Sequence, residues 1–111
     1  MSRTYDAADI ADIIFDEYSS AILTATSAEP VAVTNIVEAV GMSPATAYRR
    51  INQLVDHELL AERTWFDEAG NHIHTYESQF ESVKIEIVNG IAYLHIVGEE
   101  AHELTRLWEF Q

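Results

Sequence analysis

Apolar residues recur at helical intervals through the first quarter of the chain. Between residues 6 and 27 they fall on one stripe: Ile10, Ile13, Ile14, Tyr18, Ile22 and Leu23. This spacing predicts either one long helix or two consecutive helices. A break is expected near Asp16 to Ser19, because Asp and Ser cap helices well. Pro30 ends the segment.

A second pattern, between residues 33 and 58, predicts two helices joined by a tight turn. The first is short, has Thr34 as its N-cap, and stops at Gly41, which suits a left-handed C-terminal cap. Ser43 then supplies a new N-cap and Pro44 the first helical position. The inward side of this second helix is apolar: Ala47, Ile51, Leu54 and Val55. Two helices with such a turn form a helix-turn-helix.

Alternating apolar and polar residues in the second half of the chain predict strands. Residues 60–78 form one hairpin about a glycine-containing turn, and residues 82–97 form another about Asn89-Gly90, a strong two-residue hairpin signal. The predicted cross-strand pairs of the second hairpin are Val88–Ile91, Ile87–Ala92, Glu86–Tyr93, Ile85–Leu94, Lys84–His95 and Val83–Ile96. We expect its aliphatic face to be core, and the face with His95 to be open to solvent or a partner.

The last segment, residues 99–110, predicts an amphipathic helix with acidic residues at its amino-terminal end. Because so apolar a terminal helix needs a surface to cover, we expect it to form a two-fold dimer together with the first helix. Packing against its own domain is the alternative. The residues expected at this dimer contact are Ile10, Ile14, Leu104, Leu107, Trp108 and Phe110.

Composition limits the class of protein. A length of 111 residues with 48% hydrophobic content indicates a single domain, residues 1–111. The absence of cysteine excludes thiol chemistry, disulfides and the common structural zinc sites. The sequence has no run of about 20 apolar residues and no secretory signal, so we expect a cytoplasmic protein without membrane contact.

The charge is strongly negative and unevenly distributed. Nineteen acidic residues oppose six basic ones, which gives a net charge of −13, and Lys84 is the single lysine. This balance resembles that of proteins from halophilic archaea, in which molar salt screens the self-repulsion; a merely acidic mesophilic protein is the alternative. Residues 39–55 contain no acid and carry Arg49 and Arg50. One segment of the chain is therefore suited to a negatively charged partner.

Residues Val33 to Leu60 read VTNIVEAVGMSPATAYRRINQLVDHELL. This stretch resembles winged helix-turn-helix regulators, in particular the ArsR-like haloarchaeal proteins and more loosely their PadR-like relatives, and the resemblance covers residues 18–78. It implies an α+β fold: a winged helix-turn-helix with an N-terminal helical segment, a wing at 60–78, a second β-hairpin and a C-terminal amphipathic helix. The implied function is sequence-specific binding of double-stranded DNA by a dimeric transcriptional repressor at a palindromic operator.

In such a fold the second helix of the motif enters the major groove, and its outward residues reach base edges and phosphates. The candidate DNA contacts on this helix are Ser43, Thr46, Tyr48, Arg49, Arg50, Asn52 and Gln53. Arginine can bind guanine, and Asn or Gln can read adenine. The candidate phosphate contacts on the wing are Arg63, Asn71, His72 and His74. The alternative for Arg49 and Arg50 is pairing with nearby acids on a solvated face.

No pattern indicates catalysis or a resident cofactor. The sequence lacks a Gly-rich phosphate loop and a nucleophile elbow, so we expect no enzyme activity. His72 and His74 share one strand face, but a metal site needs three or four ligands, so we expect no metal. The alternative function is a winged-helix module for protein–protein contact in a larger assembly. The sequence leaves open the effector, the operator sequence, the target genes and whether the regulator represses or activates. It also leaves open whether the histidines bind a metal.

Overall fold

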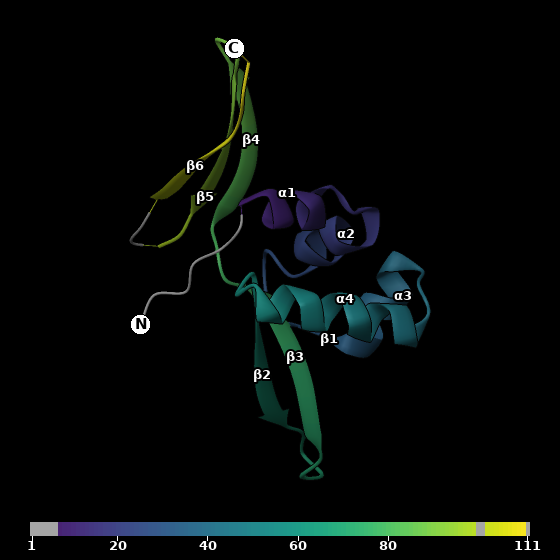
Figure 1. Ribbon diagram of the computed structural model, residues 1–111. Helices are drawn as coiled ribbons and strands as arrows, with labels where there is room; N and C mark the ends of the chain where they lie inside the picture. The colour runs from purple at the N-terminus through teal and green to yellow at the C-terminus, as the bar shows by residue number, and fades with distance from the viewer. Residues whose placement is uncertain (1–6, 100–101, 111) are drawn as a thin grey trace.

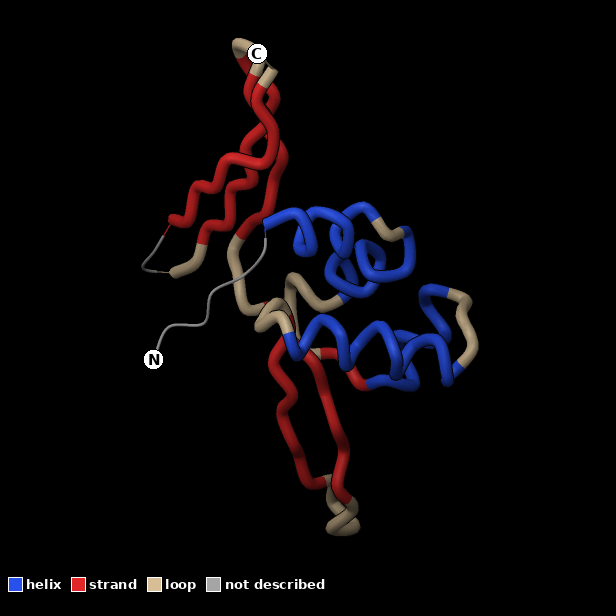
Figure 2. The backbone as a smooth tube through the Cα atoms, viewed as in Figure 1, coloured by secondary structure: helices blue, strands red, loops and turns tan. Residues whose placement is uncertain are grey.

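The computed structural model describes residues 7–99 and 102–110. This part of the chain forms the following elements: α1 (Ala7–Phe15), α2 (Glu17–Ala25), β1 (Val31–Ala32), α3 (Val33–Val40), α4 (Pro44–Asp56), β2 (Leu60–Phe66), β3 (His72–Ser78), β4 (Ser82–Val88), β5 (Ile91–Val97) and β6 (His102–Glu109). The helices form a central body, from which β2–β3 and β4–β6 project in opposite directions (Figure 1). The molecule is elongated, with extents of 60 × 30 × 23 Å. Helices and strands are therefore segregated along the molecule, an α+β arrangement (Figure 2).

The N-terminal segment consists of two helices, α1 and α2, with the break at Asp16. The carboxylate Oδ2 of Asp16 accepts a hydrogen bond from the backbone N–H of Ser19 at 2.9 Å and so caps α2. This decides between the one-helix and two-helix alternatives in favour of two. Asp6, the first residue of the predicted segment, lies outside the described residues. None of the described helices is long and apolar enough to cross a membrane.

The predicted pair of short helices is present as α3 and α4. Gly41 ends α3 in the left-handed conformation, with φ 76°. Ser43 caps α4, since its Oγ accepts a hydrogen bond from the N–H of Thr46 at 3.2 Å. The expected N-cap Thr34 is wrong: Ala32 is the N-cap, without a side-chain bond. The reason is that Ala32 also ends β1, and pairing with β3 holds it in the extended conformation from which the helix begins.

One core joins the helices to both sheets. The fully buried aliphatic residues come from α2, α3, α4 and β5: Ile22, Ile36, Ala47, Ile51, Leu54 and Leu94. Burying a side chain the size of Ile or Leu contributes about 1.5–3 kcal/mol, so these positions carry much of the stability. The predicted inward side of α4 is confirmed, with Val55 only half-buried.

The wing hairpin is present as β2 and β3, in a sheet of order β1-β3-β2. Val31 of β1 pairs with Tyr76 of β3, which ties the hairpin to the start of α3. At the turn, Asp67 accepts hydrogen bonds from the backbone N–H of Asn71 at 2.8 Å and from its side-chain amide at 3.1 Å. The base of the wing is therefore anchored to the helical body, and its tip is held by its own turn.

The second hairpin has the predicted register, with Ile85 opposite Leu94 and Lys84 opposite His95. The expected exposure of its faces is partly wrong. Ile87, on the face expected to be core, is 79% exposed, and His95, on the face expected to be open, is 8% exposed. Ile87 is exposed because the sheet extends beyond the helical body (Figure 1).

The predicted C-terminal helix at residues 99–110 is wrong, because residues 102–109 form strand β6. Residues 100–101 lie outside the described residues. β6 pairs antiparallel with β5, and Leu94 lies opposite Thr105. It also covers His95, whose Nδ1 lies 2.9 Å from Nε2 of His102 on β6. On the other side, Nε2 of His95 lies 3.0 Å from Oε1 of Glu86 on β4. The free edge of β5 provides backbone partners that outweigh the helical pattern of this segment.

Candidate nucleic-acid interface

The outward face of α4 carries polar side chains at the end of the helix that Ser43 caps. The face is formed by Thr46, Tyr48, Arg49 and Asn52. Tyr48, Arg49 and Asn52 are exposed, and Thr46 is half-buried beneath the Ser43 cap. Thr46 Oγ1 accepts a hydrogen bond from Ser43 Oγ at 3.0 Å, which fixes both hydroxyls near the helix start. This arrangement presents hydrogen-bonding groups beside a helix N-terminus, together with the Arg49 guanidinium, which has no partner among residues 7–99 and 102–110. Such a site favours anions.

Arg50 is turned away from this face toward α2. Its Nε lies 3.1 Å from Oδ2 of Asp16, and both side chains are largely covered. The buried Nε makes no hydrogen bond with any described residue, so the contact is an ion pair held by charge. The sequence left open that Arg49 and Arg50 pair with nearby acids, and Arg50 does so with Asp16. Arg50 therefore does not belong to the outward face of α4.

An acidic hollow borders the opposite flank of α4. It is lined by residues of α1 and α4 and by the residues between α1 and α2 and after α4: Asp9, Asp12, Ile13, Asp16, Arg50, Gln53 and His57. Gln53, a predicted DNA contact, therefore lies beside three carboxylates. A polyanion approaching α4 meets less repulsion on the side of Arg49 than on this side.

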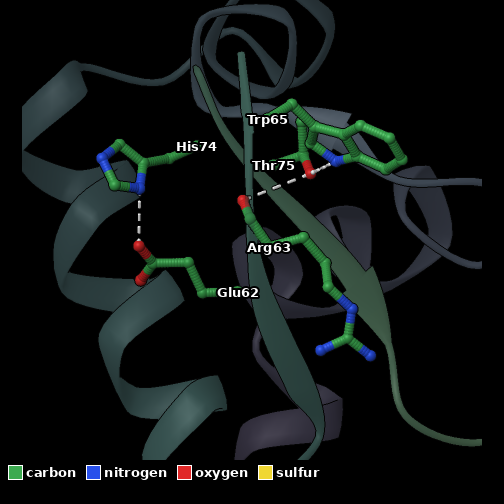
Figure 3. A network of polar contacts seen from close by, with 5 residues as sticks. All are labelled: Glu62, Arg63, Trp65, His74 and Thr75. Atoms are coloured by element: carbon green, nitrogen blue, oxygen red, sulfur yellow. Dashed lines mark hydrogen bonds and ion pairs between the residues drawn. The ribbon is translucent and has the colours of Figure 1, made fainter. Parts of the chain in front are cut away.

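A groove of about 740 Å³ separates α4 from the wing. Tyr48 and Asn52 line it from the helix, and Glu62, His74 and Tyr76 line it from the strands. Nδ1 of His74 lies 2.7 Å from Oε1 of Glu62 (Figure 3). Burial raises the pKa of the Tyr76 hydroxyl above its ordinary value, and the nearby Glu62 carboxylate adds to that rise. The groove thus holds one carboxylate that sequence reasoning missed, Glu62, which shares this face with Tyr76 because the two residues lie opposite each other across the hairpin.

The predicted wing contacts lie on both faces of the hairpin. Figure 3 shows His74 and Glu62 on one side of the strands and the side chains of Arg63, Trp65 and Thr75 on the other. Trp65 Nε1 donates a hydrogen bond to Thr75 Oγ1 at 2.9 Å. Strand alternation therefore separates Arg63 from the groove beside α4.

At the end of the wing the predicted side chains have local partners. The ring of His72 lies edge-on to Phe66 with centroids 4.7 Å apart. Asn71 is bound by Asp67, whose pKa is lowered mainly by the hydrogen bond from the Asn71 backbone N–H. In residues 7–99 and 102–110, no group of three or more His, Asp or Glu side chains is placed to hold a metal ion.

The residues expected at a dimer contact differ in how much of each side chain is exposed. Ile10 is 2% exposed and packs in the core of its own chain, so its expected role at the surface is wrong. Ile14 and Leu107 are half-buried. Leu104, Trp108 and Phe110 are exposed. The first helix is occupied by its own core, because α1 packs against β6.

The comparison with family models agrees with this geometry. Residues 15–63 match the model of a helix-turn-helix domain, from the end of α1 to the first half of β2. The match contains α3, α4 and the turn between them, and this stretch of the chain is a helix-turn-helix. No curated protein matches the chain.

Proposed function

We propose that the chain is a sequence-specific, DNA-binding transcriptional regulator that places α4 in the major groove. The observation that carries the proposal is the exposed Arg49 at the centre of the outward face of α4, within residues 39–55, the acid-free segment. Helix-turn-helix proteins use the start of this helix to reach base edges. The match of residues 15–63 supports the same class of protein.

The side chains of α4 have distinct roles in this proposal. Arg49 binds guanine through O6 and N7, and Asn52 reads adenine or reaches an adjacent base. Tyr48 and Thr46 contact phosphate or a thymine methyl group, and Ser43 offers the helix N-terminus to a phosphate. Gln53 is a weaker contact, since it borders the hollow with Asp9, Asp12 and Asp16.

The wing contributes a smaller share of the binding. His72 and His74 lie on the strand face that forms the groove beside α4, where a phosphate backbone would run. Arg63 lies on the other face and reaches DNA only if the backbone passes the outer side of the wing. Asn71 is engaged by Asp67, and the acidic tip repels phosphate.

The finer part of the proposal follows the resemblance to ArsR-like haloarchaeal regulators. The chain is a dimeric repressor that occupies a palindromic operator at high intracellular salt. A net charge of −13 disfavours binding that depends on bulk electrostatic attraction. Specific hydrogen bonds and DNA shape supply most of the discrimination under these conditions.

A binding experiment with a matched control tests the proposal. The unchanged chain first selects its site from a pool of random duplex DNA in KCl. Arg49→Ala should then weaken binding to that site by about 1–3 kcal/mol, while thermal stability stays unchanged. Arg106→Ala removes the same charge from β6, far from α4, and should bind like the unchanged chain. Equal affinities for all three proteins, or a pool from which no sequence is enriched, would contradict the proposal and favour a protein–protein module.

A further inference from the structure

β4 presents an open edge on the sheet that projects away from the wing. The strand order is β4-β5-β6, so among the described residues β4 pairs on one side only. α1 packs against β6, at the other edge of the sheet. β4 and β5 keep an unbroken register from Ser82–Val97 to Val88–Ile91. The edge of β4 therefore has a regular register, and no other described strand pairs with it.

The hairpin turn determines which backbone groups point out of this edge. Asn89 and Gly90 both have positive φ, as a two-residue turn of the primed type requires. The residues flanking such a turn form a hydrogen-bonded pair, and such pairs alternate along an antiparallel ladder. Glu86 and Lys84 therefore bond to β5. The N–H and C=O groups of Val83, Ile85 and Ile87 point outward, without a partner in the described chain.

The side chains along this edge are complementary to themselves. If a second copy of β4 lies antiparallel with Ile85 opposite the partner's Ile85, then Lys84 lies opposite the partner's Glu86. In the same register Val83 lies opposite the partner's Ile87. In this register, the residues whose N–H and C=O groups point outward (Val83, Ile85 and Ile87) all form hydrogen-bonded pairs between the two copies of β4. The charged residues fall on the intervening pairs, where side chains approach most closely.

We propose that two copies of the chain dimerise edge to edge through β4, in the register that pairs Lys84 with the partner's Glu86. The two three-stranded sheets then form one continuous sheet across a two-fold axis. Ile87, which is 79% exposed, gains an apolar neighbour in the partner's Val83. The inference rests on the proposed function for its purpose, because a two-fold pair of α4 helices matches a palindromic site.

The surroundings of Lys84 indicate that this lysine takes part in pairing with a second copy of β4 and does not prevent it. A lysine on an edge strand commonly opposes contact between sheets. Here Glu86, two residues further along the strand, reverses that effect, because each Lys84 ammonium meets the Glu86 carboxylate of the other copy. The Lys84 ammonium has no ion-pair partner within the described part of its own chain. Glu86 uses Oε1 for His95, which leaves Oε2 for the partner.

The edge formed by β6 fits a second copy less well. Its register shifts between the residues opposite Ala92 and Tyr93, which interrupts a regular ladder. Arg106 already binds Glu109 of the same strand at 2.6 Å. Self-pairing of β6 would therefore begin from an irregular edge, and its arginine is already paired within its own strand.

A charge exchange tests the register without DNA. Lys84→Glu and Glu86→Lys should each weaken dimerisation about tenfold at moderate KCl, because like charges then meet twice in each dimer. The double variant K84E/E86K should regain most of the affinity. A mixture of the two single variants should form a heterodimer, since one chain is acidic and the other basic at both positions. Masses come from sedimentation equilibrium, with circular dichroism to check folding.

A backbone variant tests the same edge independently of charge. Ile87→Pro removes an outward N–H that β5 does not use, and an edge strand tolerates this. It should weaken dimerisation at least tenfold, while the matched Ile87→Thr, which keeps the N–H, should change it less than threefold. A monomeric parent, unaltered single charge variants, or a mixture without heterodimer would each overturn the inference. A parent that still selects a DNA site under those outcomes retains DNA recognition through α4, so the two failures are distinguishable. A monomeric parent would also contradict the dimeric part of the proposed function.

Discussion

Arg50 of α4 and Asp16, the residue that caps α2, form an ion pair with Nε and Oδ2 3.1 Å apart. The same carboxylate oxygen accepts the hydrogen bond from the Ser19 N–H. One carboxylate therefore caps a helix and holds the helix that carries Arg49. The two neighbouring arginines have different tasks, since Arg50 positions α4, whereas Arg49 is exposed at its surface and has no ion-pair partner in the described part of the chain.

Arg50→Ala should lower the free energy of unfolding by about 1 kcal/mol, because it leaves Asp16 without its cation at a partly covered site. Arg49→Ala, which removes the same charge from an exposed position, should leave the stability within about 0.5 kcal/mol of the parent. Urea unfolding of both variants at one KCl concentration measures the difference. Equal stability losses would show that the Asp16 ion pair contributes nothing specific.

The stability that Asp16 contributes should disappear in acid. The hydrogen bond from the Ser19 backbone N–H, and after it the positive charge of Arg50, lower the pKa of Asp16 below its ordinary value of 3.8. A carboxyl with a lowered pKa in the folded state stabilises the protein above its unfolded pKa, and this contribution is lost as pH falls through the folded value. The stability gap between the parent and Asp16→Asn should therefore be constant near neutrality and shrink below about pH 4. A gap that stays constant down to pH 2 would refute this.

Ser43 combines a structural and a proposed binding role, which two substitutions can separate. Ser43→Ala removes the acceptor of the Thr46 N–H and should cost about 1 kcal/mol of stability. Ser43→Asp keeps an N-cap and should be as stable as the parent, but it adds negative charge where a phosphate is proposed to bind. DNA affinity should therefore fall in Ser43→Asp although the fold is unchanged. Normal affinity in this variant would place the phosphate elsewhere.

Glu62 should weaken DNA binding in the unchanged chain. Its carboxylate lines the groove between α4 and the wing, beside Tyr48 and Asn52. Glu62→Gln keeps a hydrogen-bonding partner for His74 and removes the charge, so affinity should rise roughly twofold to fivefold, as expected for about 0.5–1 kcal/mol at an exposed site. Glu77→Gln serves as a control, because Glu77 lies on the other wing face. A rise in both variants would indicate a general charge effect.

The dependence of specific binding on salt should be shallow or reversed. The acid-free residues 39–55 carry +2, and the remaining residues carry −15 because the total is −13. Few cations are then released from DNA on binding, and the acidic flanks take up cations instead. Titrations from low to molar KCl on the selected site measure the slope. A steep loss of affinity with rising KCl would contradict this account.

The sequence predicted the elements whose signals are local. Ser43 and Pro44 begin α4, and the Asn89-Gly90 turn sets the register of β4 and β5, so both could be placed from their own neighbours. The structure of residues 102–109 could not be predicted in this way. Their pattern fits a helix, but pairing with the edge of β5 makes them a strand.

The same distinction applies to the candidate site. Arg49 was placed from the helical period of α4 alone. The engagement of Arg50 depends on Asp16, 34 positions earlier in the chain, and the position of Glu62 depends on how the wing folds back toward α4. Which polar residue is free and which is occupied is thus a tertiary property.

The placement of the two tryptophans gives this molecule built-in optical probes. Trp65 lies on β2 of the wing, and Trp108 lies on β6 of the second sheet. The wing and the second sheet project from opposite ends of the helical body (Figure 1). Both indoles are more than half exposed, so their emission responds to anything that covers them. Variants that keep a single tryptophan would let fluorescence at one end of the protein be recorded without interference from the other.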